Sequence, residues 1–429
     1  MIRMNTFLKS LILPICFILS AKFAVAQTPA KILLVHGFLH VGNGQVIEDA
    51  LVGIQNEKIV LVKNALAYTY NSKEWDTIID LKGQQVYPGF VAPNSILGLT
   101  EIDAVNASLD FNELGTFNPH IRSQIAYNVE SNVIATVRTN GVLLTQTTPR
   151  GGLIAGSSSV MHLDGWNWED ATILADDGIH LQWPSSEEHG DNGLKRSENY
   201  ELDKREIYQF FKLSKTYAET DKHTKYDLRL EAMKNCFTST KRVYIHANTI
   251  QQILDVIDFS KEFGIKFPVI VGGYDSHLAT AQLKDAKIPV MLPRVHSLPE
   301  HEEDHVNLPY LLPSLLQAGG VKFCLQNEGD MDAMNSRNIP FLAGTAKAYG
   351  LTEEQAIQSV SLSSCEIMGV GKEYGSIEEG KKATLFVSTG NALDMRTNNV
   401  VLALIDGKLM SLDNRQKELF RKYSEKYAK

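Results

Sequence analysis

The sequence is poor in cysteine. Its 429 residues include 4 cysteines, and the three that follow the N-terminal segment, Cys236, Cys324 and Cys365, lie far apart. An odd number of widely spaced cysteines does not make a disulfide framework. No Cys-x-x-Cys pair is present, so a zinc site built from thiolates is not expected. We therefore interpret these cysteines as ordinary buried residues.

A concentration of positive charge is also missing. The formal net charge is −8, charged residues make up 21% of the chain, and no long basic tract occurs. Binding to nucleic acid depends on a concentrated basic surface that neutralises phosphates. The sequence therefore predicts no nucleic-acid partner. Its hydrophobic content of 44% is ordinary for a soluble globular protein.

Long apolar runs are absent after the N-terminus. There, Arg3 and Lys9 precede a short apolar run at 11–19, and the small-x-small sequence Ala24-Val-Ala26 follows. This pattern is typical of a secretory signal peptide, residues 1–26. The run is shorter than the stretch of about 20 residues that a spanning helix needs, which disfavours a permanent anchor. We expect export across the inner membrane, a periplasmic location, and no membrane insertion after cleavage.

Short strand-like segments lie near both ends of the mature chain. Near the start they are 31–35, 50–54, 58–62 and 77–81, and near the end they are 383–388 and 401–405. Turn signals such as Gly42-Asn-Gly44 separate them. Neither group alone makes a sheet that buries both faces. We therefore expect a composite β-sandwich formed by 27–87 together with 371–412.

Between these ends, strand-like runs alternate with helical patterns. The strands are expected at 142–146, 242–246, 267–271, 288–292 and 321–325, and the helices at 122–139, 203–236, 249–263, 307–318 and 352–368. Such alternation indicates an α/β fold with parallel strands and crossover helices. Because both chain ends share one small domain, we predict an inserted (β/α)8 TIM-type barrel over 88–370. The charged stretch 187–231 predicts a helical insertion, and 413–429 a charged helical tail.

Four stretches carry a resemblance to a known family. They are Val86-Tyr-Pro-Gly-Phe-Val91, Ile245-His-Ala247, Gly350-Leu-Thr-Glu-Glu-Gln-Ala356 and Gly375-Ser-Ile-Glu-Glu-Gly-Lys-Lys-Ala-Thr-Leu385. With them, nearly the whole mature chain resembles the amidohydrolase superfamily, especially its imidazolonepropionase-related branch. The resemblance implies that the first stretch enters barrel strand one, that His246 lies on strand five, and that the last stretch returns to the sandwich.

The resemblance also implies a divalent metal, and most of its ligands are missing here. Members of this branch typically bind the metal through a His-x-His pair on strand one, histidines after strands five and six, and an Asp after strand eight. Imidazole and carboxylate ligands suit zinc or iron, and such a metal generates hydroxide from bound water. In this sequence Asn94 and Ile96 replace the His-x-His pair, and Gly272 stands in place of the strand-six histidine.

Two candidate ligands remain. His246 is retained, and Glu328 stands near the position of the family's Asp, with Asp330 as a second choice. The resemblance therefore implies His246, Glu328 and Asp330 as catalytic residues, and His246 and Glu328 as metal ligands. The implied cofactor is one divalent metal, zinc or iron, that is weakly held or absent.

Three further polar residues are candidates for substrate binding. Asn94 lies at the end of the expected first strand. Arg150 precedes the glycine-rich stretch 151–158, which lacks the Lys of a phosphate loop. We expect either a loop at the barrel mouth that holds a substrate anion or a structural turn. Arg337 follows strand eight, where it contacts either a substrate carboxylate or a neighbouring loop.

Two other stretches have competing interpretations. His301-Glu-Glu-Asp-His305 matches H-E-x-x-H literally, but Pro299 and Pro309 flank it, which favours a polar loop over a zinc-binding helix. Met161-His-Leu-Asp-Gly-Trp-Asn-Trp168 is dense in large side chains. It is expected either to wall a pocket or to pack in the core.

The sequence leaves two functions open. The first is an amidohydrolase-type hydrolase that acts on non-peptide C–N bonds of a small amide, cyclic or open-chain, with a degraded metal site. The second is a catalytically inactive member of the family that serves as a binding or partner subunit. The expected partners are a small-molecule substrate and a paralogous amidohydrolase subunit or a second copy of this chain.

Overall fold

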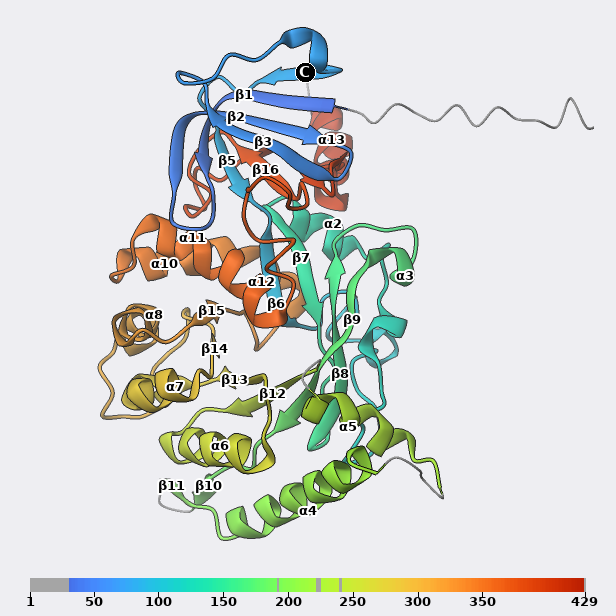
Figure 1. The fold of residues 1–429 in the computed structure, drawn as a ribbon, viewed down its shortest axis with the longest axis vertical. Coiled ribbons are helices and arrows are strands. Elements are labelled where there is room, and N and C mark those ends of the chain that lie inside the picture. The colour runs from blue at the N-terminus through green and yellow to red at the C-terminus, as the bar shows by residue number, and fades with distance from the viewer. Residues whose placement is uncertain (1–30, 191–192, 221–224, 239–240, 428–429) are drawn as a thin grey trace, which may run out of the picture.

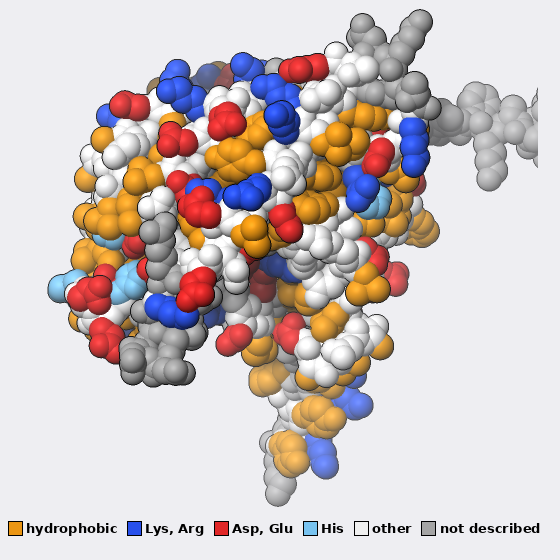
Figure 2. All heavy atoms as spheres, turned by 90° about the horizontal axis from the view of Figure 1, so that it is seen from below, with side chains coloured by type: hydrophobic (Ala, Val, Ile, Leu, Met, Phe, Trp, Pro, Cys, Tyr) orange, Lys and Arg blue, Asp and Glu red, His pale blue; other side chains and the backbone are white. Residues whose placement is uncertain are grey.

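The computed structural model describes residues 31–190, 193–220, 225–238 and 241–427 (Figure 1). The predicted signal peptide lies outside these ranges. Within them, no helix has both the length and the apolarity needed to cross a membrane. On the face seen in Figure 2, Lys and Arg side chains are interspersed with Asp and Glu, so that face presents no continuous basic patch.

Strands from both ends of the chain form one sheet at one end of the molecule (Figure 1). Its order is β18-β17-β16-β5-β1-β2-β3, with β4 paired to β1. The strands are β1 Lys31–His40, β2 Val46–Gln55, β3 Lys58–Asn64, β4 Thr77–Asp80, β5 Gln85–Pro88, β16 Leu385–Ser388, β17 Val400–Ile405 and β18 Lys408–Leu409. One apolar cluster joins Leu34 and Val52 to Leu385 and Leu404. The pairing gives one continuous sheet, so a sandwich of two sheets is not confirmed.

A second sheet of eight strands forms a nearly closed barrel. Its order is β15-β14-β13-β12-β9-β8-β7-β6. The strands are β6 Phe90–Ser95, β7 Val142–Thr147, β8 Ile154–His162, β9 Thr172–Gln182, β12 Arg242–Ala247, β13 Pro268–Gly272, β14 Val290–Leu292 and β15 Phe323–Leu325. The first and last strands of this order, β6 and β15, have no ladder between them in the described residues.

One strand departs from the predicted parallel barrel. β8 is antiparallel to both β7 and β9, whereas the other neighbouring pairs are parallel. The prediction of a glycine-rich loop over 151–158 is therefore wrong from Ile154 onward. Residues 151–153 form the turn before the strand, and Gly151 and Gly152 there have φ of 91° and 65°. A short connection reverses the chain here, and a crossover helix is not needed between antiparallel strands.

The helices, apart from the exposed C-terminal one, contribute buried side chains to the core around the barrel. They are α2 Asn132–Arg138, α3 Trp168–Ala171, α4 Tyr200–Ala218, α5 Leu228–Thr238, α6 Ile250–Phe263, α7 Thr280–Ala286, α8 Leu308–Gly319, α9 Asp332–Asn335, α10 Ile339–Ala348, α11 Glu353–Ser359, α12 Leu362–Met368 and α13 Arg415–Tyr427. Within the predicted helical tail, residues 415–427 form α13. The predicted helices 203–236 and 352–368 each form two helices. The charged insertion also contains the hairpin β10 Glu187–Gly190 and β11 Gly193–Arg196.

Helix α6 shows how local sequence places side chains at the barrel mouth. Thr249 caps its N-terminus, and Thr249 and Gln252 form a reciprocal capping box. Gly264, in the left-handed conformation at φ 68°, ends the helix. Buried residues such as Ile253 and Phe259 face the core. The capped N-terminus of α6 therefore lies immediately after the carboxyl end of β12 in the chain.

Candidate functional site

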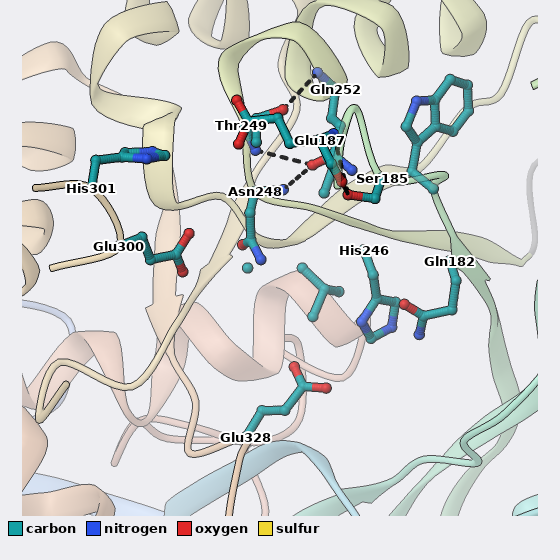
Figure 3. Close-up of a pocket in the computed structure, with 14 residues that line it drawn as sticks. Gln182, Ser185, Glu187, His246, Asn248, Thr249, Gln252, Glu300, His301 and Glu328 are labelled. Atoms are coloured by element: carbon teal, nitrogen blue, oxygen red, sulfur yellow. Dashed lines mark hydrogen bonds between the residues drawn. The ribbon is translucent and has the colours of Figure 1, made fainter. Parts of the chain in front are cut away.

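A pocket of about 560 Å³ lies at the carboxyl ends of β9, β12 and β13 (Figure 3). In barrels built from parallel strands, this end is where functional side chains gather. His246, the penultimate residue of β12, lies beside Gln182 of β9, because the two residues are paired in register. Polar side chains that line the pocket include Gln182, His246, Asn248, Gln252, Glu300 and Glu328.

His246 is hydrogen-bonded to a second histidine inside the barrel. Its Nε2 lies 3.0 Å from Nδ1 of His180 on β9. His180 is fully buried and stacks on the ring of Tyr244, with 4.7 Å between ring centroids. Burial lowers the pKa of His246 to about 4, with the Arg150 charge adding to this effect and Glu328 opposing it. The pKa of His180 is lowered too, first by burial. Both rings are therefore neutral near pH 7.

The buried surroundings select one arrangement of protons. Nε2 of His180 is buried and has no hydrogen-bond partner in the described residues. A buried N–H without an acceptor is costly, so we assign the proton of His180 to Nδ1, which donates to Nε2 of His246. The proton of His246 is then on its own Nδ1. His246 thus presents an N–H donor on a side chain that lines the pocket.

Glu328 brings negative charge to the same pocket. It follows β15, and its carboxylate Oε2 accepts a hydrogen bond of 2.9 Å from Nδ2 of Asn94. Burial alone would raise the pKa of Glu328, but the Arg150 charge and the side-chain hydrogen bonds of Gln326 and Asn94 lower it. The side chain is 37% exposed, so its ionised carboxylate remains accessible as an acceptor.

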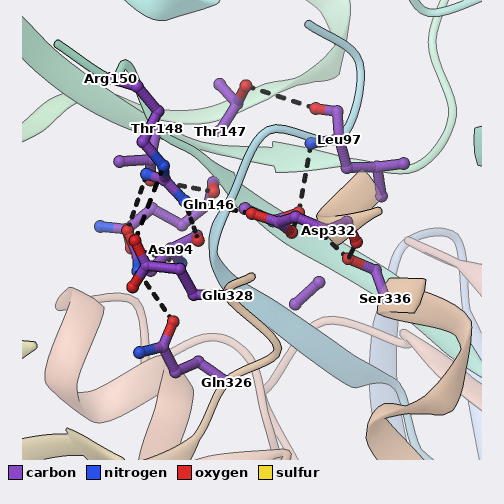
Figure 4. A network of polar contacts seen from close by, with 12 residues as sticks. Asn94, Leu97, Gln146, Thr147, Thr148, Arg150, Gln326, Glu328, Asp332 and Ser336 are labelled. Carbon is purple, nitrogen blue, oxygen red and sulfur yellow. Dashed lines mark hydrogen bonds and ion pairs between the residues drawn. The ribbon is translucent and has the colours of Figure 1, made fainter. Parts of the chain in front are cut away.

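Asn94 and Arg150 form a polar network next to the pocket (Figure 4). Asn94 is buried at φ 49°, a left-handed conformation that Asn tolerates better than most residues. Nη1 of Arg150 donates to Oδ1 of Asn94 at 3.0 Å, and Nη2 donates to the Asn94 carbonyl at 2.8 Å. Nη2 also donates to Oδ2 of Asp332 at 3.1 Å. Burial raises the pKa of Asp332 to about 6, while Arg150 opposes the increase.

The network continues into the barrel interior. Gln146 accepts a hydrogen bond from the backbone N–H of Asn94 at 3.0 Å. Its amide nitrogen donates to Asp177 at 2.8 Å, and Ser158 also donates to Asp177, at 2.7 Å. The hydroxyl of Tyr244 donates to the same carboxylate at 2.5 Å. Four strands therefore contribute side chains to this network, and β6 contributes the backbone N–H of Asn94.

Comparisons with known proteins agree with this architecture. Residues 175–410, more than half of the chain, match the amidohydrolase family. The chain belongs to this family. The match does not separate the imidazolonepropionase-related branch from others, so that finer assignment stays a prediction. Among curated proteins, no significant match is found.

Solved structures similar to this amidohydrolase-family chain support the same fold. An amidohydrolase from Thermotoga maritima MSB8 has a TM-score of 0.76 and 23% identity, over 89% of this chain and 99% of that one. A prolidase complexed with N-methylphosphonate-L-proline has a TM-score of 0.55 and 15% identity, over 89% and 100%. Molinate hydrolase has a TM-score of 0.55 and 13% identity, over 90% and 95%. At these identities the likeness shows the fold alone.

The residues of this amidohydrolase-family chain do not fit the metal that the family usually binds. In the part of the chain that the structure describes, no group of three or more His, Cys, Asp and Glu side chains is placed to hold a metal ion. Ile96 is buried among apolar side chains. Gly272 has φ 93°, and a Cβ there would lie 2.2 Å from Oδ1 of Asn248. A histidine at either position would therefore require the surroundings to rearrange.

The structure separates the residues that the sequence predicted for the site. His246 and Glu328 line the pocket together. Asn94 and Arg150 lie in the adjoining network, where the donors of Arg150 contact protein acceptors. Asp330 is exposed and Arg337 contacts Met334 through its guanidinium at 3.6 Å; neither lines the pocket. Residues 301–305 form a polar turn, as predicted, and His301 reaches the pocket wall.

Sequence reasoning missed His180 and Gln182, and after the last strand it chose Asp330 as a catalytic candidate instead of Asp332. The signal for the first two was the alternation in Gly178-Ile-His-Leu-Gln182, which places His180 and Gln182 on one face of a strand. Asp332 is two residues beyond the predicted Asp330, and only the short helix α9 makes it point inward. Loop offsets of this kind are not encoded in strand periodicity.

Proposed function

We propose that this chain binds a small amide-containing molecule in the pocket and does not use the metal-dependent hydrolysis of its family. The observation that carries the proposal is the pairing of a neutral His246, fixed by His180, with an ionised Glu328 in one pocket. An imidazole N–H complements an amide carbonyl, and a carboxylate complements an amide N–H. The hydrogen bond between the carboxylate and the amide N–H is charge-assisted and is therefore the stronger of the two.

The surroundings of the pair support a small polar ligand. Gln182, Asn248 and Gln252 add amide groups to the wall. The prolidase neighbour is described with N-methylphosphonate-L-proline, and a Xaa-Pro dipeptidase neighbour with methionine bound in its active site. Small molecules derived from amino acids are therefore the first class to test.

The remaining expectations belong to the same proposal. As a binding subunit, the chain would associate with a paralogous amidohydrolase or with a second copy of itself. We also propose that the chain is exported to the periplasm and that it belongs to the imidazolonepropionase-related branch. The size of the purified mature protein in solution tests the association, because a chain that stays monomeric and alone at physiological concentration contradicts it.

A second candidate is hydrolysis of a non-peptide C–N bond in a small amide without a metal. The geometry that favours it is the shared pocket of His246 and Glu328. The N–H of His246 would polarise the carbonyl, and the Glu328 carboxylate would accept a proton from the attacking water. Turnover that persists in chelator and is lost in Glu328→Gln would establish this candidate over binding alone.

The experiment uses a panel of N-acetyl amino acids, prolyl dipeptides and cyclic imides. Binding to the purified mature protein is followed by ligand-observed NMR and turnover by product analysis, with and without chelator. We expect saturable binding that His246→Gln weakens at least tenfold, about 1.4 kcal/mol. The matched control His277→Gln, outside the pocket, should leave binding unchanged. Turnover that chelator abolishes and zinc restores would overturn the proposal.

A further inference from the structure

The seam of the barrel is closed by side chains. β6 and β15 have no ladder between them in the described residues. Nδ2 of Asn94 on β6 instead donates to Oε1 of Gln326 at 2.8 Å and to Oε2 of Glu328 at 2.9 Å, both beyond β15. Ser95 donates to Asp332 across the same gap at 2.8 Å. The polar end of the seam thus collects oxygen atoms from both sides.

The guanidinium of Arg150 lies among these oxygens (Figure 4). Its nitrogens lie 3.0 Å from Oδ1 of Asn94, 2.8 Å from the Asn94 carbonyl, 3.1 Å from Asp332 Oδ2 and 3.8 Å from Glu328 Oε1. Two of the four groups are carboxylates, and the Arg150 side chain is only 16% exposed. Carboxylate, amide and backbone oxygens are the ligands that hard divalent cations prefer.

We propose that these four oxygens form a latent cation site, that the guanidinium of Arg150 is its resident cation, and that this charge keeps divalent metal ions out. The planar fork of Arg suits several oxygens at once, and its charge is permanent. Position 150 follows β7, so the cation reaches the seam from a neighbouring strand. The proposal concerns the chain's own cation and does not depend on the ligand of the pocket.

The chemistry of the oxygens indicates which ion would replace Arg150. Carboxylate, carbonyl and amide oxygens suit Mn²⁺, Mg²⁺ and Ca²⁺ better than they suit zinc. His246 lies close enough for Glu328 and Arg150 to shift its pKa. Mn²⁺ accepts such a mixed set, and its electron paramagnetic resonance spectrum reports binding directly. Mn²⁺ is therefore the probe.

The experiment compares Mn²⁺ binding by the full mature chain with that of Arg150→Met and Arg150→Lys. Methionine preserves much of the side-chain volume without the charge, and lysine preserves the charge. We expect Arg150→Met to bind about one Mn²⁺ per chain at least tenfold more tightly than the wild type. Arg150→Lys should resemble the wild type. Glu328→Gln in the Arg150→Met background should lose the gain.

Three results would overturn the proposal. One is a folded Arg150→Met protein, judged by circular dichroism, that gains no Mn²⁺ affinity. Another is a wild type that already binds Mn²⁺ as tightly as the variant through Glu328. If Arg150→Met does not fold in metal-free buffer, refolding with Mn²⁺ is expected to rescue it, and the absence of rescue also overturns the proposal. None of these readouts uses ligand binding in the pocket, so the proposed function is judged separately.

Discussion

The two ends of the barrel interior are built on different principles. At the end next to α12, Leu144, Val160, Met291 and Cys324 from four strands pack in one apolar cluster with Met368. Each is fully buried. At the carboxyl ends of the strands, charged and hydrogen-bonded side chains replace them. The same strands therefore contribute apolar side chains to one end of the barrel interior and polar side chains to the other end.

This difference separates what holds the fold from what defines the site. Apolar packing depends on volume and tolerates many sequences. A buried polar network depends on each partner, because an unsatisfied charge or donor costs more than the bond contributes. We expect substitutions at the polar end to be severe and rescuable by a second substitution. Substitutions at the apolar end should follow side-chain volume.

The largest effect is expected at Arg150. In metal-free buffer, Arg150→Met leaves the buried Asp332 without its counter-charge, and the loss of one partner of such a pair costs about 3–5 kcal/mol. Adding Asp332→Asn removes the uncompensated charge, so the double variant should be more stable than Arg150→Met alone. Urea unfolding of the four proteins gives the coupling free energy. Additive effects would show that Arg150 and Asp332 are not coupled. That result would contradict the expectation that the polar end of the barrel depends on specific partners.

The apolar end should respond to volume. Met291→Ala removes buried atoms from β14 and leaves a cavity, which we expect to cost about 2–5 kcal/mol. Met291→Leu conserves volume and should cost less than about 1.5 kcal/mol. Both variants should bind pocket ligands as the wild type does, measured at a temperature where all are folded. Equal losses for Ala and Leu would argue against a packing role.

The pH dependence of stability should separate two residues of the polar end. The pKa of Asp332 is raised to about 6 in the fold, so its contribution is present at low pH and is lost as the pH rises from about 4 to 6. The pKa of His246 is lowered to about 4, so its contribution is present above about 6.5 and is lost as the pH falls. Each contribution to the free energy of unfolding is on the order of 3 kcal/mol. In the wild type the two contributions change in opposite directions with pH and offset each other.

Variants reveal these opposing slopes. Between pH values of about 4 and 6.5, the stability of Asp332→Asn should rise with pH more steeply than that of the wild type, and the stability of His246→Gln should fall relative to it. Urea unfolding at several pH values in this range provides the measurement. Parallel curves for the three proteins would mean that neither group titrates differently in the fold.

Sequence reasoning identified the parts of the fold with strong local signals. Apolar β-branched runs located β12 and β13, and the helical pattern at 249–263 located α6. β8 and β9 were missed because Gly156, Ser157–Ser159 and Gly178 are poor strand formers on their own. These residues form strands here because their polar groups find hydrogen-bond partners in the fold. Ser158, for example, donates a hydrogen bond to Asp177. Tertiary contacts therefore override local propensity at these two strands.

The site was predictable where a motif carried it. His246 came from the Ile245-His-Ala247 motif and Glu328 from its place after the last strand. The Arg150–Asp332 contact joins residues 182 positions apart across an unpaired seam. No periodicity encodes such a contact, because it depends on a left-handed Asn94 and on the course of two loops. Asn94, Ile96 and Gly272 at the family's metal-ligand positions indicated that most of the usual ligands are missing. They did not indicate which contacts form in this region instead.

The smallest effect is expected in the aromatic segment 161–168, for which the sequence left pocket wall and core packing open. Trp166 is 90% exposed and lies outside the pocket, so Trp166→Ala should change stability by less than about 0.5 kcal/mol. Trp168 packs against the core, and Trp168→Ala should cost more than Trp166→Ala. Thermal unfolding of the pair decides the matter. Equal costs would show that exposure in this segment does not report on packing, whereas the expected order makes Trp168 an anchor of the β8–β9 connection beside the barrel.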